Sequence, residues 1–83
     1  MSPEQDQVME MVRTHLSGEL GVPGDQIGGD TRFREDLDAD SLDLYELVME
    51  LEDTYGVKMS EEEAAGILTV GQAVEFVVAR APA

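Results

Sequence analysis

Apolar residues recur at helical spacing from the start of the chain. Four of them stand at steps of four residues: Val8, Val12, Leu16 and Leu20. This period places them on one face of a helix, so the pattern predicts an amphipathic helix over about residues 3–20. Ser2 is a suitable N-cap and Pro3 suits the first turn, because proline has no backbone N–H to leave unpaired there.

Residues 21–40 interrupt the helical pattern. The segment is rich in Gly and Asp, which favour turns and loops over regular helix. We therefore predict a long loop that contacts the core through Ile27, Phe33 and Leu37.

A second helix is predicted over residues 41–55. Either Asp40 or Ser41 can cap its N-terminus, and Gly56 is a typical C-terminal stop. With about 100° of rotation per residue, five apolar side chains face the core: Leu44, Leu47, Val48, Leu51 and Tyr55.

The same helix has a second apolar face. Its members lie roughly 100–160° from Leu44 and cannot join the core face: Leu42, Tyr45 and Met49. Glu46, Glu50, Glu52 and Asp53 surround them. Apolar side chains set among carboxylates are typical of a surface that binds a basic partner briefly, since charge speeds the encounter and apolar contact holds it.

Capping signals also mark the starts of two further helices. Ser60 with Glu63, and Thr69 with Gln72, have the spacing of capping boxes. They predict helices over about residues 61–66 and 70–80. The expected fold is all-α: one domain over residues 1–83, built as a four-helix bundle of three principal helices and one short helix, with the long loop between the first two.

Charge and composition limit the function classes. The 83-residue chain has 19 acidic and 5 basic residues and a net charge of −14. Such a surface repels nucleic acid and anionic membrane, so we expect neither as a partner. The 42% of apolar residues in helical register argue against disorder. A polar, acidic N-terminus without signal-peptide features favours a cytoplasmic location.

Ser41 draws attention because it stands where a helix begins. A nucleophilic serine needs a base, and the only His, His15, lies on the first helix near its apolar side. The acidic surroundings would also oppose an oxyanion. We therefore expect no catalytic residue and no enzyme.

A calcium-binding loop starting at Asp36 is excluded by register. Its sixth position must be Gly and is Ser41, and its twelfth must be Glu and is Leu47. We expect no dedicated metal site. Two interpretations of Ser41 remain from residue chemistry: a hydroxyl for covalent modification at a helix start, which suits a phosphate ester, or a plain helix cap in an acidic interaction or cation-binding module.

The segment Asp36-Leu-Asp-Ala-Asp-Ser-Leu-Asp43 resembles the attachment motif of acyl carrier proteins, whose central serine carries 4′-phosphopantetheine. The resemblance continues through residues 46–49, 51–53 and 67–70 and covers essentially the whole chain. It implies that a phosphopantetheinyl transferase (holo-acyl carrier protein synthase) transfers the arm from coenzyme A to Ser41. The monomeric carrier would then shuttle thioester-bound acyl intermediates between a ketosynthase, an acyltransferase and other enzymes of fatty acid biosynthesis. A polyketide, aminoacyl or other specialised cargo is the alternative.

The resemblance also implies roles for further residues. Eight would contact partner enzymes: Asp40, Leu42, Asp43, Tyr45, Glu46, Met49, Glu52 and Ile67. Four would line a space that shelters the acyl chain: Phe33, Leu51, Ala64 and Leu68. Asp38 departs from the family pattern, which usually has Gly there. Loss of the freedom of glycine is expected to alter the loop before Ser41.

Overall fold

The computed structural model describes residues 4–81, which form four α-helices and one short 3₁₀ turn. The elements are α1 (Gln5–Leu20), η1 (Gly24–Gln26), α2 (Ser41–Tyr55), α3 (Glu61–Ala65) and α4 (Val70–Arg80). The predicted all-α fold, with a long loop between the first two helices, is confirmed. No helix within residues 4–81 is both long enough and apolar enough to cross a membrane.

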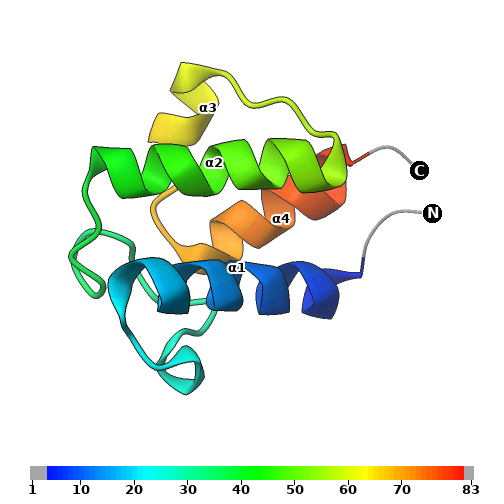
Figure 1. Ribbon diagram of the computed structural model, residues 1–83. Coiled ribbons are helices and arrows are strands. Elements are labelled where there is room, and N and C mark those ends of the chain that lie inside the picture. The colour runs from blue at the N-terminus through cyan, green and yellow to red at the C-terminus, as the bar shows by residue number, and fades with distance from the viewer. Residues whose placement is uncertain (1–3, 82–83) are drawn as a thin grey trace.

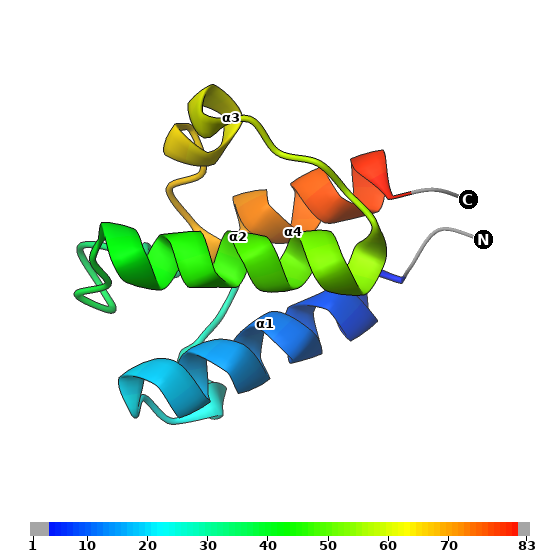
Figure 2. The same cartoon turned by 45° about the horizontal axis from the view of Figure 1, so that its top comes forward.

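The three long helices make the body of the molecule, and α3 lies to one side (Figure 1). α1 runs in the opposite direction to α2 and packs most extensively against α4. In the turned view of Figure 2, α3 stands away from the layer of α1, α2 and α4 and is joined to α2 by an extended segment. Figure 1 also shows the start of α2 at the same end of the molecule as the loop that leads into it.

The core is wholly apolar among the described residues. All three predicted loop anchors, Ile27, Phe33 and Leu37, are buried in it. α1 contributes Val8, Val12 and Leu16, as its spacing predicted. From α2 only Leu47 and Leu51 are fully buried. Leu44 and Tyr55 pack against the core while half-buried, and Val48 is also half-buried.

The helix starts follow local side-chain chemistry. Both predicted capping boxes are present. The side chains of Ser60 and Thr69 each accept a hydrogen bond from the N3 backbone N–H, and their own backbone N–H groups donate to the N3 side chains. α2 is capped by Asp40, which makes Ser41 the first helical residue. α1 begins at Gln5 with Glu4 in the N-cap position; the predicted Ser2–Pro3 start lies outside the described residues.

Backbone hydrogen bonds tie the long loop to the start of α4. The Val70 N–H donates to the Thr31 carbonyl at 2.9 Å, and the Phe33 N–H donates to the Leu68 carbonyl at 3.1 Å. The Gly71 N–H donates to the Gly29 carbonyl at 2.9 Å. These bonds, with the three buried anchors, hold the segment that leads into Ser41 against the bundle.

Candidate functional site

Ser41 presents an exposed hydroxyl that the helix does not need. Asp40 Oδ1 accepts from the Asp43 N–H at 2.9 Å, and Asp43 Oδ2 accepts from the Asp40 N–H at 3.1 Å. This reciprocal box supplies the cap, and the hydrogen bond from the Asp43 backbone lowers the pKa of the Asp40 carboxyl. The interpretation of Ser41 as a plain N-cap is therefore wrong, because its neighbour takes that role.

Arg34 lies against this hydroxyl. Its Nη2 donates to Ser41 Oγ at 3.0 Å across a separation of seven residues. Sequence reasoning missed the contact, because two residues on either side of an irregular loop have no periodic relation. The nearest available signal was a basic residue standing within an acidic segment.

Asp38 adopts a left-handed backbone conformation, with φ of 54°. Glycine takes this conformation without steric cost, and Asp is among the few other residues that tolerate it. The next residue, Ala39, is buried, and its N–H donates to the Phe33 carbonyl at 2.9 Å. We expected the absence of glycine at this position to change the loop. Instead, Asp38 itself adopts the left-handed conformation that glycine would take.

Arg32 and Asp36 brace the same loop. The Arg32 N–H donates to Asp36 Oδ2 at 2.8 Å, and the Arg32 guanidinium pairs with both Glu35 and Asp36. The side-chain hydrogen bonds from Arg32 lower the pKa of Asp36. The Arg32 guanidinium therefore pairs with carboxylates of its own loop, those of Glu35 and Asp36.

The outer face of α2 exposes large apolar side chains next to Ser41. Leu42 and Tyr45 are each 62% exposed and Met49 is 45% exposed, whereas Leu47 on the same helix is 2% exposed. The prediction of two apolar faces is confirmed. These three exposed side chains, which we call the outer apolar face, continue directly from the serine along the helix.

Besides the cap residue Asp40, three acidic residues were assigned to partner contact, and they have different surroundings. Asp43 and Glu46 lie on the side of α2 toward α1, where their carboxylate oxygens and that of Glu19 fall within 4.8 Å of one another. Glu52 is half-buried, and its Oε2 accepts from the Met59 N–H at 3.0 Å. Glu52 therefore also holds the segment between α2 and α3.

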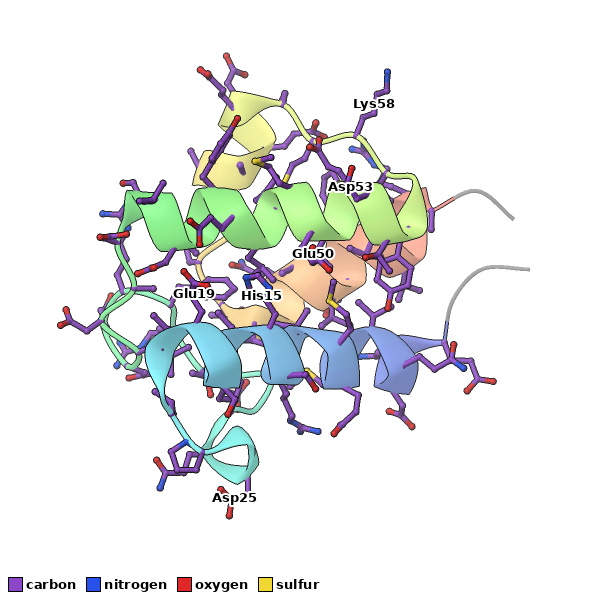
Figure 3. The ribbon with its side chains drawn as sticks, viewed as in Figure 1. His15, Glu19, Asp25, Glu50, Asp53 and Lys58 are labelled. Atoms are coloured by element: carbon purple, nitrogen blue, oxygen red, sulfur yellow. The ribbon has the colours of Figure 1, made fainter. Side chains whose placement is uncertain are left out.

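Glu19 and Glu46 face each other across the α1–α2 boundary. The hydrogen bond and the negative charge of Glu19 raise the pKa of Glu46. Figure 3 shows His15 and Glu50 farther along this boundary. His15 Nε2 is buried and has no hydrogen-bond partner within residues 4–81. The side chain that hydrogen-bonds to Ser41 Oγ is Arg34, not His15.

Two open hollows flank α3. One, of about 510 Å³, opens beside Ser41 between α2 and α3 and is lined by Val48, Met59 and Ala64 among others. The other, of about 400 Å³, lies toward the long loop and brings together three of the predicted cavity residues, Phe33, Ala64 and Leu68. Ile67, predicted to contact partners, is half-buried on this second hollow. Leu51, the fourth cavity residue, is 1% exposed within the core and lines neither hollow.

Comparisons with known proteins agree on one family. Residues 10–77 match the family described as "Phosphopantetheine attachment site". The chain is 41% identical over 75 residues to the acyl carrier protein of Rubrobacter xylanophilus, covering 90% of this chain and 93% of that protein. Its fold superposes with a TM-score of 0.83 on the acyl carrier protein from Enterococcus faecalis, at 34% identity, covering 95% of this chain and all of that one.

Acyl carrier proteins are carriers rather than enzymes, and a covalently attached 4′-phosphopantetheine supplies the thiol that holds the cargo. The end of the molecule around Ser41 fits such an arm. It offers an exposed hydroxyl free of capping duty, the N-terminus of a 15-residue helix and an arginine within hydrogen-bond distance. The chain belongs to the phosphopantetheine-attachment family and, within it, to the acyl carrier proteins.

Proposed function

We propose that Ser41 is the residue that carries the 4′-phosphopantetheine arm and that the chain shuttles acyl intermediates of fatty acid biosynthesis. The observation that carries this proposal is the position of the Ser41 hydroxyl. It is exposed at the first residue of α2, is not used as the helix cap, and adjoins the outer apolar face. A serine so placed can enter the active site of a modifying enzyme without disturbing the fold.

The partners are enzymes with basic patches that dock on α2. A phosphopantetheinyl transferase would dock first, and a ketosynthase and an acyltransferase would follow. The net charge of −14 supports fast encounter with such patches. Leu42, Tyr45 and Met49 supply exposed apolar contact at the centre of the same surface. Brief docking suits a carrier that works as a monomer. We place it in the cytoplasm, where coenzyme A would supply the arm.

The cargo would shelter against α3. The hollow beside Ser41 is lined partly by Val48, Met59 and Ala64, whose apolar side chains suit an alkyl chain. This placement makes the hollow between α2 and α3 the first site for the cargo. The hollow lined by Phe33 and Leu68 shares Ala64 with the first and would extend this site toward the long loop.

Acyl transfer to a ketosynthase of dissociated fatty acid synthesis tests the docking surface. The variant Glu46→Lys reverses a charge beside the outer apolar face and should lower the second-order rate constant by about tenfold at low salt. Glu75→Lys is the matched control, because Glu75 is exposed on α4 and the net charge changes equally. Equal losses in the two variants would mean that net charge alone governs the encounter, and would remove α2 as the docking surface.

A further inference from the structure

Arg34 is the one basic residue in contact with Ser41 within the described part of the chain. The other four basic residues are engaged or placed elsewhere: Arg13 with Glu10 and the Ile27 carbonyl, Arg32 with Glu35 and Asp36, Arg80 with Glu63, and Lys58 in the segment after α2. Lys58 follows the opposite end of α2 from Ser41 and points away from the molecule (Figure 3). The chain has only 5 basic residues against 19 acidic ones, and one of the five, Arg34, donates a hydrogen bond to the Ser41 hydroxyl.

The arm would bring an unfavourable charge to this end of the molecule. A phosphodiester on Ser41 adds a negative charge beside Asp40 and near Asp38 and Asp43. The N-terminus of α2 offsets part of the repulsion, because its backbone N–H groups favour an anion. The Asp40 carboxylate already accepts from one of these groups, the Asp43 N–H, so a nearby cation would offset more of the repulsion on the phosphate.

We propose that Arg34 is a positioning residue that holds the phosphate of the arm and so fixes the direction in which the arm leaves Ser41. The proposal rests on attachment at Ser41. When Oγ becomes an ester oxygen it is a poorer acceptor, and the negative charge lies on the non-bridging oxygens bonded to the same phosphorus. The guanidinium, 3.0 Å from Oγ in the unmodified chain, is already within reach of those oxygens. Its planar fork of N–H donors matches two phosphate oxygens at once.

The direction of the arm follows from where Arg34 sits. Arg34 and Ser41 both line the hollow between α2 and α3, together with Tyr45 and Ala65. A phosphate held by Arg34 is therefore kept at the rim of this hollow. The chain would use Arg34 to direct the arm toward α3 and away from the side of α2 that faces α1.

The test compares apo and holo forms of the full chain, with mass measurement confirming each conversion. In isotope-labelled wild-type protein, the Nε–H signal of Arg34 should move on modification while that of Arg32 stays in place. Phosphorus NMR should show a different phosphodiester shift in Arg34→Gln, with Arg34→Lys between it and the wild type. Lys58→Gln is the matched control, because it removes one positive charge at the other end of α2 and should leave the phosphorus shift unchanged.

Stability gives an independent measure. Arg34→Gln should lower the folding equilibrium constant of the holo form more than that of the apo form, by roughly 1.5- to 5-fold, the range for exposed ion pairs. Lys58→Gln should affect both forms equally. Normal modification with equal effects of Arg34→Gln on both forms and an unmoved Arg34 signal would overturn the role of Arg34 alone. A mass gain that persists in Ser41→Ala would instead overturn the attachment site, and the role of Arg34 with it.

Discussion

Leu47→Ala and Leu42→Ala make the same chemical change on the two faces of α2. Comparing them shows how much each face contributes to stability. Leu47 is 2% exposed and Leu42 is 62% exposed. Both substitutions alter helix propensity in the same direction, so propensity nearly cancels between them. The difference in the free energy of unfolding therefore reports burial.

The expected magnitude follows from the buried area. Leu→Ala removes three carbons, and at about 0.8 kcal/mol for each buried carbon the transfer loss is about 2.4 kcal/mol. The cavity left among close-packed neighbours adds to this, which gives about 2–5 kcal/mol for Leu47→Ala. A domain of 83 residues has only about 4–12 kcal/mol of stability in total, so the effect is a large fraction of it. Leu42→Ala should cost less than about 0.5 kcal/mol.

Urea denaturation followed by far-UV circular dichroism measures both values, provided that the two variants have the same dependence on denaturant. Leu42→Ala should in turn slow acyl transfer to a ketosynthase, because its side chain lies on the outer apolar face. Losses of stability within about 0.5 kcal/mol of each other would refute the assignment of the two faces.

Three further predictions concern the loop, the α1–α2 boundary and the start of α4. Asp38→Gly should be more stable in thermal unfolding than Asp38→Ala by about 0.5–1 kcal/mol, because both remove the charge but only alanine keeps a Cβ at a positive φ; equal stabilities would contradict a left-handed residue there. Glu46→Gln should raise the melting temperature at pH 7. Glu19 raises the pKa of Glu46 in the folded state, so ionised Glu46 destabilises the fold at neutral pH. The gain should vanish below about pH 4, where Glu46 is protonated in both states; a gain that is independent of pH would argue against the pair. Gly71→Ala should cost about 1–3 kcal/mol in chemical denaturation, because its Cβ would lie 2.8 Å from a backbone carbonyl oxygen of the loop. Gly18→Ala, whose added Cβ has no atom within 4 Å beyond its chain neighbours and its own helix backbone, should not destabilise, and similar losses in the two variants would contradict the close contact.

Features with a local cause could be predicted from the sequence. The capping boxes at Ser60 and Thr69 depend on residues three positions apart, and both formed as expected. The burial of Leu47 and the exposure of Leu42 followed from helical rotation alone. The start of α2 was ambiguous because Asp40 and Ser41 can both cap a helix. In the structure Asp40 is the cap: its carboxylate accepts from the Asp43 N–H, and the Asp43 carboxylate accepts from the Asp40 N–H.

Contacts between separate elements could not be predicted in this way. The pairing of Glu19 with Glu46 depends on how α1 lies against α2, which no spacing along the chain encodes. The contact of Arg34 with Ser41 depends on the path of an irregular loop, which is set by its buried anchors and by the left-handed turn at Asp38. Leu51 was assigned to the acyl-chain space by resemblance alone. It is fully buried in the core, and its role in sheltering cargo stays a prediction.

The most direct test of the account is the mass of the protein after modification. Wild-type chain and Ser41→Ala are each incubated with coenzyme A, Mg²⁺ and a broad-specificity phosphopantetheinyl transferase, and the intact proteins are weighed. We expect the wild type to gain the mass of one phosphopantetheine arm and Ser41→Ala to gain none. An unchanged wild-type mass, or the same gain in Ser41→Ala, would contradict it.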